Sequence, residues 1–411
     1  MTSTLFVNIG ELVTLAPLVR DKKVQAHEEK DLGAIKGAWL YIKAGKVADY
    51  GTSPWPLAYE KSIKVDALGK LVLPGLIDSH THPFFAGNRS KEFCLRLDGK
   101  SYQDIAAMGG GIKSTVKASR AASDEELVQL CTKRIQKFIE RGVTAVEVKS
   151  GYGLSVDEEL RHLRLLNQIK STLPCELHIT CLAFHDHLGP ESKETYIAEV
   201  TNKLLPILAK EQLCASVDAF IEEGYYRASD IDPFMKKAQE LGLFVRIHAD
   251  EFSDAKAAVA AARWQAKSAD HLQFADSTGI ASMAQAGVIA TLLPSTSIYT
   301  KIPYTQAPKY FKAGVAVALA TDYNPGSSPI ANLPLIASLG ALHCQLNTAQ
   351  CLSAITRVPA FSLNLAQTKG SLDLGFDADL VITNLSSKEE FLADFGQTPM
   401  SQVWIKGSRV Y

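Results

Sequence analysis

Residues 71–82, Leu-Val-Leu-Pro-Gly-Leu-Ile-Asp-Ser-His-Thr-His, join an apolar run to two closely spaced histidines. The first seven residues form a short apolar run of the length and composition of a buried strand. His80 and His82 follow two positions apart, so the alternation of side chains along extended backbone places both imidazoles on one side. Neutral imidazole is the commonest protein ligand for metals. The stretch therefore predicts a buried strand that ends in two metal ligands.

Eight apolar runs of this kind alternate with segments of helical periodicity through the middle of the chain. They are Leu71–Ile77, Val143–Val148, Glu176–Leu182, Ser216–Ile221, Leu243–Ile247, Ser268–His271, Val288–Leu292 and Val315–Ala320. Ser123–Arg141 and Val156–Ser171 are clear amphipathic stretches between them. Eight strands with intervening helices predict an α/β protein built on a closed (β/α)8 TIM-type barrel. In that fold the chemistry lies at the carboxyl ends of the strands.

The two ends of the chain have a different pattern. Short strands broken by turns occupy residues 1–70, and the same pattern returns over residues 370–411. We therefore expect both ends to form one small β-sandwich-like domain, with residues 71–369 as the catalytic barrel. His82–Ala122 contains Gly109–Gly111 and little periodicity. It is expected to be a lid or binding loop on the catalytic side.

Composition limits the kind of partner. The 411 residues include 43 basic and 44 acidic side chains, so no global charge would recruit nucleic acid or an anionic membrane. No apolar run reaches the length of a membrane span. The seven cysteines lack CxxC spacing and the first residues lack a secretory pattern, which favours a reducing cytoplasm. A small-molecule substrate is expected, and a homodimer is the commonest assembly.

Further candidate ligands follow other runs. His248 ends the fifth run and Asp322 ends the eighth, while His271 closes the sixth. We predict one divalent or trivalent ion on His80, His82, His248 and Asp322, with His271 as a neighbouring or catalytic residue. Zinc, iron and manganese all accept this ligand set.

Glu251 lies three residues after His248. Its carboxylate can reach a metal-bound water without binding the metal, which is the placement that a general base needs. A cation on an open site lowers the pKa of bound water to about 7. We therefore predict hydrolysis by metal-bound hydroxide, with Glu251 as the proton shuttle.

Several motifs resemble the amidohydrolase superfamily along the whole chain: LPGLIDSHTH, HADE, ADH, ATDYNPGSSP and GSLDLGFDADLVI. Within it, HTHPFFAGNRSKEF, GGGI, EVKSGYGL, FHDH, HADEFSD and TDYNPGSSP are similar to the imidazolonepropionase family. Some amidohydrolases bridge two metals with a carboxylated lysine. Here Glu222 and Glu223 follow the fourth run instead of a lysine, which favours one metal.

The resemblance implies hydrolysis of the cyclic amide C–N bond of 4-imidazolone-5-propanoate to N-formimidoyl-L-glutamate, a step of histidine degradation. It also implies substrate contacts from Arg89, Tyr102, Tyr152, His185, Glu251, Asn324, Gly326 and Ser327. Arg89 is a fixed cation that can bind the carboxylate tail in a bidentate fork. His185 or His271 would stabilise the oxyanion, and His187 competes with His185 for that assignment.

Two other functions fit parts of this pattern. The same metal, glutamate and histidine could deliver hydroxide to the amidine carbon of a nucleobase or related heterocycle, which would make the protein a deaminase. A catalytically silent scaffold on the same barrel is the other alternative. A scaffold has no need of five chemically competent side chains at strand ends.

Overall fold

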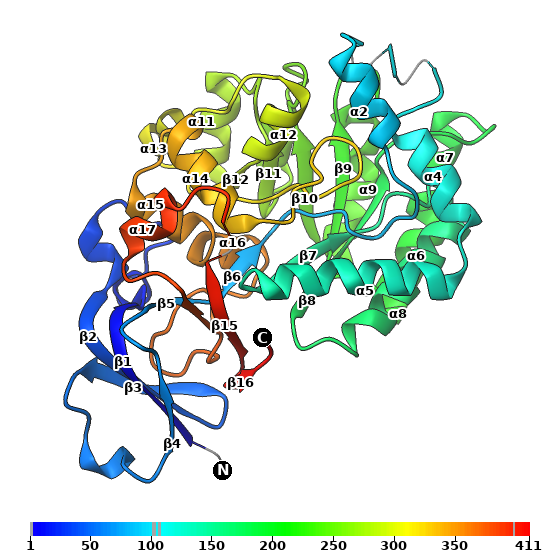
Figure 1. Ribbon diagram of the computed structural model, residues 1–411. Helices are drawn as coiled ribbons and strands as arrows, with labels where there is room; N and C mark the ends of the chain where they lie inside the picture. The colour runs from blue at the N-terminus through cyan, green and yellow to red at the C-terminus, as the bar shows by residue number, and fades with distance from the viewer. Residues whose placement is uncertain (1–2, 101–103, 106–107, 398) are drawn as a thin grey trace.

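Two eight-stranded sheets organise the protein. The computed structural model describes residues 3–100, 104–105, 108–397 and 399–411. One sheet is parallel and comes from the middle of the chain, whereas the other is mixed and combines both chain ends. In Figure 1 the mixed sheet, in blue and red, lies beside the barrel. The predicted α/β barrel with a separate β-domain from both ends is confirmed.

The parallel sheet is a nearly closed barrel. Its strands are β6 (Leu76–Asp78), β7 (Val143–Lys149), β8 (Glu176–Phe184), β9 (Ser216–Ile221), β10 (Phe244–Ala249), β11 (Ser268–His271), β12 (Ile289–Leu292) and β13 (Val317–Leu319). Each pairs with the next in chain order, from β6 to β13. Just beyond the two outer strands, Thr81 forms a parallel bridge with Tyr323, and the Asp322 amide donates to the His80 carbonyl at 3.0 Å. The barrel thus closes at the predicted ligands.

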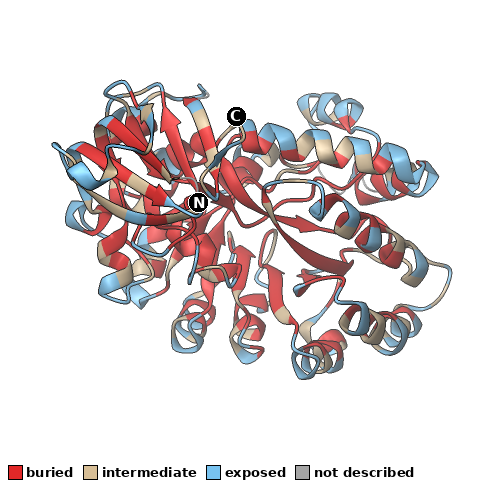
Figure 2. Cartoon of the chain, turned by 90° about the horizontal axis from the view of Figure 1, so that it is seen from below, coloured by how far each residue is buried: buried red, intermediate tan, exposed pale blue. Residues whose placement is uncertain are grey.

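Helices surround the barrel, and Figure 2 shows buried strands inside with exposed helix faces outside. Helices α1 to α9 are Ala16–Arg20, Ser90–Leu97 (α2), Ile112–Ala121 (α4), Asp124–Glu140 (α5), Val156–Lys170 (α6), Lys193–Glu199 (α7), Leu205–Glu211 (α8) and Ala228–Glu240 (α9). Helices α10 to α17 are Ala257–Arg263, Ser277–Ala286, Pro294–Thr300, Ala307–Ala313, Leu333–Cys344, Thr348–Ala354, Arg357–Ser362 and Lys388–Ala393. Short 3₁₀ turns span Glu29–Leu32 and Leu57–Tyr59, and a π-helical turn spans Val200–Leu204.

The predicted helices agree closely with the structure. Helix α5 begins after Ser123, whose side chain accepts a hydrogen bond from the Glu126 amide as an N-cap. Helix α6 begins in the same way after Ser155, which accepts from the Glu158 amide. The segment predicted as a loop over His82–Ala122 differs, since it carries α2 and α4.

The first predicted run is divided between the two sheets. Residues 71–74 form β5 of the mixed sheet, and only residues 76–78 enter the barrel as β6. Gly75 lies between them, where a Cβ atom would stand 2.2 Å from Oγ1 of Thr144. The Gly75 amide donates to Asp379 at 2.8 Å, and the next amide, of Leu76, donates to Gly142 at 2.9 Å. The prediction of one continuous strand was therefore wrong, because a residue without a side chain lets the chain cross between sheets. The other seven runs match β7–β13 to within two residues.

The mixed sheet joins the two chain ends. Its strands are β1 (Ser3–Val13), β2 (Ala34–Lys43), β3 (Lys46–Thr52), β4 (Ile63–Asp66), β5 (Leu71–Pro74), β14 (Leu380–Thr383), β15 (Met400–Ile405) and β16 (Ser408–Arg409). Strand β5 pairs in parallel with β1 and antiparallel with β14, so it connects the two halves. The sheet also extends past residue 70, where we predicted the domain boundary.

Two further predictions concern the whole chain. Among the described residues, no helix is both long and apolar enough to cross a membrane. The seven cysteines are all free thiols, and Cys94 alone is exposed.

Candidate active site

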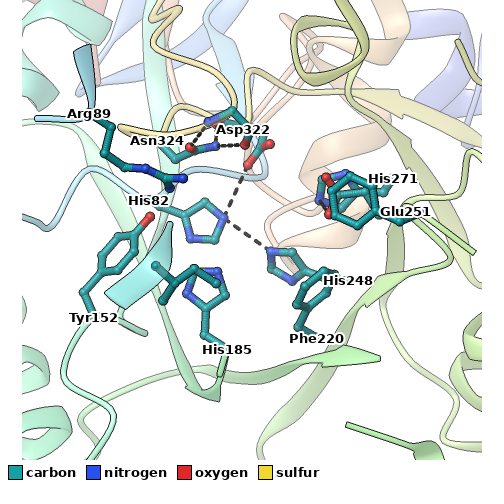
Figure 3. A pocket seen from close by; sticks show the side chains of 13 residues that line it. His82, Arg89, Tyr152, His185, Phe220, His248, Glu251, His271, Asp322 and Asn324 are labelled. Carbon is teal, nitrogen blue, oxygen red and sulfur yellow. Dashed lines mark hydrogen bonds and ion pairs between the residues drawn. The ribbon is translucent and has the colours of Figure 1, made fainter. Parts of the chain in front are cut away.

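The predicted histidine and aspartate ligands meet at the carboxyl ends of the barrel strands. Figure 3 shows three of them, His82, His248 and Asp322. His80 and His82 follow β6, His248 lies in β10, and Asp322 follows β13. Nε2 of His82 lies 3.2 Å from Nε2 of His80 and 3.3 Å from Nε2 of His248. Oδ1 of Asp322 lies 3.5 Å and 3.4 Å from the Nε2 atoms of His80 and His82. Strands far apart in sequence thus bring four potential ligand atoms together.

This geometry fits a bound cation. Ligand atoms about 2.0–2.1 Å from one tetrahedral ion stand about 3.3 Å apart. The four separations above, 3.2 to 3.5 Å, are close to that value. The side chains are at most 4% exposed. A second convergent group contains His80, His271 and Asp322, so His271 also lies within reach of the same position.

Buried carboxylates orient two of the histidines. Nδ1 of His80 lies 2.7 Å from Oδ2 of Asp270, and Nδ1 of His248 lies 3.0 Å from Oδ2 of Asp218. A carboxylate on the outer nitrogen directs the other nitrogen of the ring toward a metal. Burial lowers the pKa of His80, but Asp270 and Asp322 outweigh that effect and raise it to about 9. The surroundings of His80 therefore stabilise positive charge, as a site for a metal cation must.

The backbone at Asp322 has an unusual conformation. Its φ is 49°, in the left-handed region that non-glycine residues rarely adopt. Thr296 donates from Oγ1 to Oδ2 of Asp322, which leaves Oδ1 directed at the histidines. On the neighbouring segment, Asp78 accepts from the amide and hydroxyl of Thr321 at 3.1 and 2.7 Å. These bonds hold the end of β13 against the end of β6.

Lys149 is engaged in ion pairs. Its Nζ lies 2.7 Å from Oε1 of Glu147 and 2.7 Å from Oδ2 of Asp218. A carboxylated lysine would place a third negative charge against these two. The geometry therefore agrees with the prediction of a site without a bridging lysine.

Glu251 and His271 face each other in the pocket. Nε2 of His271 lies 3.6 Å from Oε2 of Glu251, and the carboxyl side chain is 7% exposed. Burial, together with the charges of Asp322 and Glu222, raises the pKa of Glu251 well above its ordinary value. Burial also lowers the pKa of His271 to about 3. A carboxyl group that holds protons readily thus lies beside a neutral imidazole.

His185 has a defined tautomer. Its Nδ1 lies 3.0 Å from the carbonyl oxygen of Gly151, which can only accept, so Nδ1 carries the proton. Burial lowers the pKa of His185 to about 3, so the ring is neutral and Nε2 is a hydrogen-bond acceptor. The ring lies nearly parallel to that of His82, with centroids 5.5 Å apart. His185 lines the pocket, whereas His187 lies in a separate outer groove.

Arg89 packs against the turn that follows β13. A Cβ atom at Gly326 would lie 1.9 Å from NH1 of Arg89, so only glycine allows this approach. Oδ1 of Asn324 accepts from the amides of Gly326 and Ser327 at 2.8 and 2.7 Å, which fixes the turn. Nε of Arg89 donates to Oε2 of Glu92 at 2.7 Å. The guanidinium is therefore held in one orientation.

One pocket collects most of the predicted residues, with apolar walls from Ile112, Phe220 and Phe252. Its lining is His82, Arg89, Ile112, Tyr152, His185, Phe220, His248, Glu251, Phe252, His271, Asp322, Asn324 and Ser327. Figure 3 shows Arg89 and Tyr152 on one side of His82, with Glu251 and His271 on the other. Tyr102 lies outside the described residues, so its role stays a prediction.

Comparison with known proteins agrees with this geometry. The model of the amidohydrolase family matches residues 71–410. The imidazolonepropionase of Idiomarina loihiensis is 40% identical over 386 residues, which cover 92% of this chain and 94% of that protein. The chain belongs to the imidazolonepropionase family. The member from Caldanaerobacter subterraneus is 37% identical, over 95% of this chain and 94% of its own. The protein is therefore a hydrolytic enzyme.

Solved structures share the fold of this imidazolonepropionase-family chain at low identity. A triazine hydrolase variant has a TM-score of 0.78 at 14% identity and covers 99% of this chain and 94% of its own. The 5-methylcytosine deaminase of Klebsiella pneumoniae has a TM-score of 0.74 at 18% identity, over 99% and 98%. Amidohydrolases use a divalent metal, and a histidine-rich cluster suited to one is present here.

The sequence prediction missed the supporting carboxylates. Asp218 and Asp270 lie within barrel strands and look like ordinary buried polar residues until the strands are placed side by side. Glu92 accepts from Arg89, from the Gly111 amide at 3.1 Å and from Oγ of Ser114 at 3.0 Å. Its spacing of three residues from Arg89 was a usable signal, because residues i and i+3 meet on a helix.

Proposed function

We propose that this protein hydrolyses the cyclic amide C–N bond of 4-imidazolone-5-propanoate to N-formimidoyl-L-glutamate. The observation that carries the proposal is one pocket with a held arginine on one side and a convergent histidine–aspartate cluster on the other (Figure 3). Membership of the imidazolonepropionase family over nearly the whole chain supports the same substrate. The reaction belongs to histidine degradation.

His80, His82, His248 and Asp322 would hold one divalent ion, and zinc or iron suits these ligands. When bound, the ion supplies Lewis acidity, which lowers the pKa of a coordinated water to about 7 and polarises a carbonyl. The buried Asp218 and Asp270 support this assignment, since they orient two of the imidazoles.

Arg89 would bind the propanoate tail. A guanidinium pairs with a carboxylate through two parallel hydrogen bonds and so fixes both distance and orientation. Tyr152 is 2% exposed and lies on the same side of His82, where its hydroxyl can add a further contact. Asn324 and Ser327 line the wall beside Arg89. With the tail held there, the ring carbonyl is directed toward the histidines.

The two candidate histidines would have different roles. Neutral His185 donates from Nδ1 to Gly151, so Nε2 can accept a hydrogen bond from a ring N–H of the substrate. It cannot donate to an oxyanion without a second proton. Nδ1 of His271 has no hydrogen-bond partner among the described residues, so this ring can take the tautomer that donates. We therefore assign oxyanion stabilisation to His271.

Glu251 would carry the proton. Its carboxylate accepts a proton from the water that adds to the ring carbonyl carbon. It returns this proton to the ring nitrogen as the C–N bond breaks, and the carbonyl carbon becomes the new carboxylate. The raised pKa of Glu251 supports this role, because a carboxyl group with a pKa closer to the working pH both accepts and donates protons effectively.

The test is the ultraviolet decay of freshly prepared 4-imidazolone-5-propanoate with the purified protein, before and after chelation and with zinc or iron restored. Metal-dependent decay that yields formimidoylglutamate is the expected result. No decay in metal-loaded protein would overturn the proposal. Ammonia release from cytosine or guanine would instead identify a deaminase.

A pair of variants tests the assignment of the tail. Arg89→Met should raise KM strongly, because the ground-state contact to the carboxylate is lost. Arg164→Met is the matched control, since Arg164 pairs with Glu211 on the surface and should leave both constants unchanged. Unchanged KM in Arg89→Met would remove Arg89 from the substrate site.

The protein is also proposed to work as a cytoplasmic homodimer. Free cysteines suit a reducing compartment, and two-fold dimers are the commonest assemblies of soluble proteins. Sedimentation equilibrium of the purified protein tests the dimer, and a monomeric mass would contradict it.

A further inference from the structure

Beneath the predicted metal ligands, the barrel interior contains a chain of buried charges. It consists of three carboxylates and two cations from four strands, all with fully buried side chains: Glu147 and Lys149 on β7, Asp218 on β9, Arg246 on β10 and Asp270 on β11. Such a set is costly to bury, because each ion loses its hydration. It calls for an explanation beyond packing.

Glu147 is the centre of this network. Its Oε1 lies 2.7 Å from Nζ of Lys149 and 2.9 Å from Nε of Arg246. Oγ1 of Thr180 donates to the same oxygen at 2.6 Å. One carboxylate therefore holds both cations of the barrel interior.

Each cation leads to a different carboxylate. Nζ of Lys149 lies 2.7 Å from Oδ2 of Asp218. NH2 of Arg246 lies 3.4 Å from Oδ2 of Asp270 and donates to the Ser79 carbonyl at 2.7 Å. The latter bond also ties Arg246 to the segment that carries His80.

Each of these carboxylates then reaches a predicted metal ligand. Asp218 lies 3.0 Å from Nδ1 of His248, and Asp270 lies 2.7 Å from Nδ1 of His80. The two branches therefore run from Glu147 through Lys149 or Arg246 to two imidazoles on opposite strands.

We propose that Glu147, Lys149 and Arg246 are positioning residues that hold Asp218 and Asp270 in place, and thereby set how tightly His248 and His80 bind the metal. This inference rests on the metal site of the proposed function. It assigns these three residues no contact with substrate. Groups bonded directly to ligand histidines, here Asp218 and Asp270, typically change metal affinity by about 10–100-fold when they are lost. Lys149 and Arg246 lie one contact further away and Glu147 two, so the lower end of that range is expected.

The decisive experiment compares Lys149→Met with Lys369→Met. Lys369 is a matched control, because its Nζ also lies between two carboxylates, at 3.2 Å from Asp377 and 2.5 Å from Asp379, and is 3% exposed. Zn²⁺ affinity is measured on the full-length proteins by competition with a chromogenic chelator. The visible absorption of the Co²⁺-substituted proteins reports ligand geometry.

Lys149→Met should bind Zn²⁺ about tenfold more weakly and show an altered Co²⁺ spectrum, whereas Lys369→Met should match the unaltered protein. At saturating zinc, KM for the substrate should be unchanged in both. Equal zinc affinity in Lys149→Met and the unaltered protein would overturn the inference, as would an equal loss in Lys369→Met.

Two milder variants keep the test valid if Lys149→Met does not fold. Glu147→Gln keeps the size of the side chain and removes its charge. Thr180→Val removes one hydrogen bond to Glu147. Weaker Zn²⁺ binding in both, with the larger loss in Glu147→Gln, supports the inference, and unchanged binding in both overturns it. Absence of zinc binding in the unaltered protein would instead contradict the proposed function.

Discussion

Lys149 and Lys369 are both buried between two carboxylates, the first inside the barrel and the second beside the mixed sheet. Their local chemistry is the same, but the groups beyond them differ. Asp218, next to Lys149, continues to His248. Asp379, next to Lys369, instead accepts from the backbone amide of Lys406 at 2.8 Å. The burial and geometry of an ion pair therefore do not reveal its role. The next group that its carboxylate contacts indicates whether the pair supports the metal ligands or only the fold.

The largest effect on turnover should come from replacing Glu251, the proposed proton shuttle. Glu251→Gln is expected to lower kcat by about 10²–10⁴-fold, because an amide cannot carry the proton. Zn²⁺ affinity should not change, since Glu251 is not assigned as a ligand. Steady-state kinetics and chelator competition on the same preparation measure both. Full turnover with metal bound would exclude the shuttle role.

Replacement of Lys369 should affect the stability of the fold and leave catalysis unchanged. Lys369→Met leaves the Asp379 carboxylate buried without its cation, which should cost about 3–5 kcal/mol in the free energy of unfolding. Urea denaturation measures this loss, and kcat/KM in native buffer should remain unchanged. A fall in kcat/KM without loss of stability would mean that this ion pair also communicates with the site.

The stabilisation of the folded protein by zinc should distinguish the Lys149 variant from the Lys369 variant in one measurement. At free zinc about a thousandfold above its Kd, binding should stabilise the unaltered protein and Lys369→Met by about 4 kcal/mol. In Lys149→Met, a tenfold weaker site should reduce that gain to about 2.7 kcal/mol. Denaturation with and without zinc gives the difference. An identical gain in all three proteins would remove the distinction between the two lysines.

A buried histidine, His162, extends the comparison: its Nε2 lies 3.8 Å from Oε2 of Glu158, too far for a hydrogen bond. It is fully buried against Phe84, and its ring nitrogens have no hydrogen-bond partner among the described residues. Burial lowers its pKa to about 3, so the folded protein keeps it neutral. Below the unfolded pKa of 6.5, only the unfolded chain takes up the proton, and stability is lost as pH falls toward 3.

His162→Leu should therefore reduce the pH dependence of stability. Between pH 6.5 and pH 5 the histidine should contribute about 1.6 kcal/mol of the loss, because half of the unfolded chains are already protonated at pH 6.5 and each pKa unit corresponds to about 1.36 kcal/mol. Urea denaturation of both proteins at the two pH values measures this difference. Parallel stability curves would show that His162 is solvated or paired when the protein is in solution.

The smallest effect should come from a carboxylate at the edge of the pocket. Glu92→Gln weakens the hydrogen bond that orients Arg89 by about 1 kcal/mol. KM should therefore rise roughly fivefold, with kcat nearly unchanged. Glu92→Asp tests whether charge alone restores KM. A fall in kcat without a change in KM would show that Glu92 acts on the reaction instead of on substrate binding.

Local pattern predicted most of the fold because strand and helix periodicities are set by neighbours in sequence. The eight runs, and helices such as α5 with its Ser123 N-cap, needed no tertiary information. The division at Gly75 could not be predicted, because the apolar run is continuous and the reason for the break is the approach of Thr144. Helices α2 and α4 were missed for a different reason, since polar residues take part in their buried faces: Glu92 in α2, and Thr115 and Ser119 in α4.

The local sequence pattern was enough to place five residues at strand ends: His80, His82, His248, His271 and Asp322. It did so because the end of a strand is a local property and the barrel gathers all its ends on one side. The choice of His271 over His185 that we propose for the oxyanion needed the tertiary structure, since the carbonyl that faces Nδ1 of His185 sets the tautomer of that ring. The tertiary structure likewise shows that the Asp218 carboxylate beside Lys149 reaches His248, whereas the Asp379 carboxylate beside Lys369 reaches a backbone amide. Such partners on different strands depend on the register and stagger of the barrel.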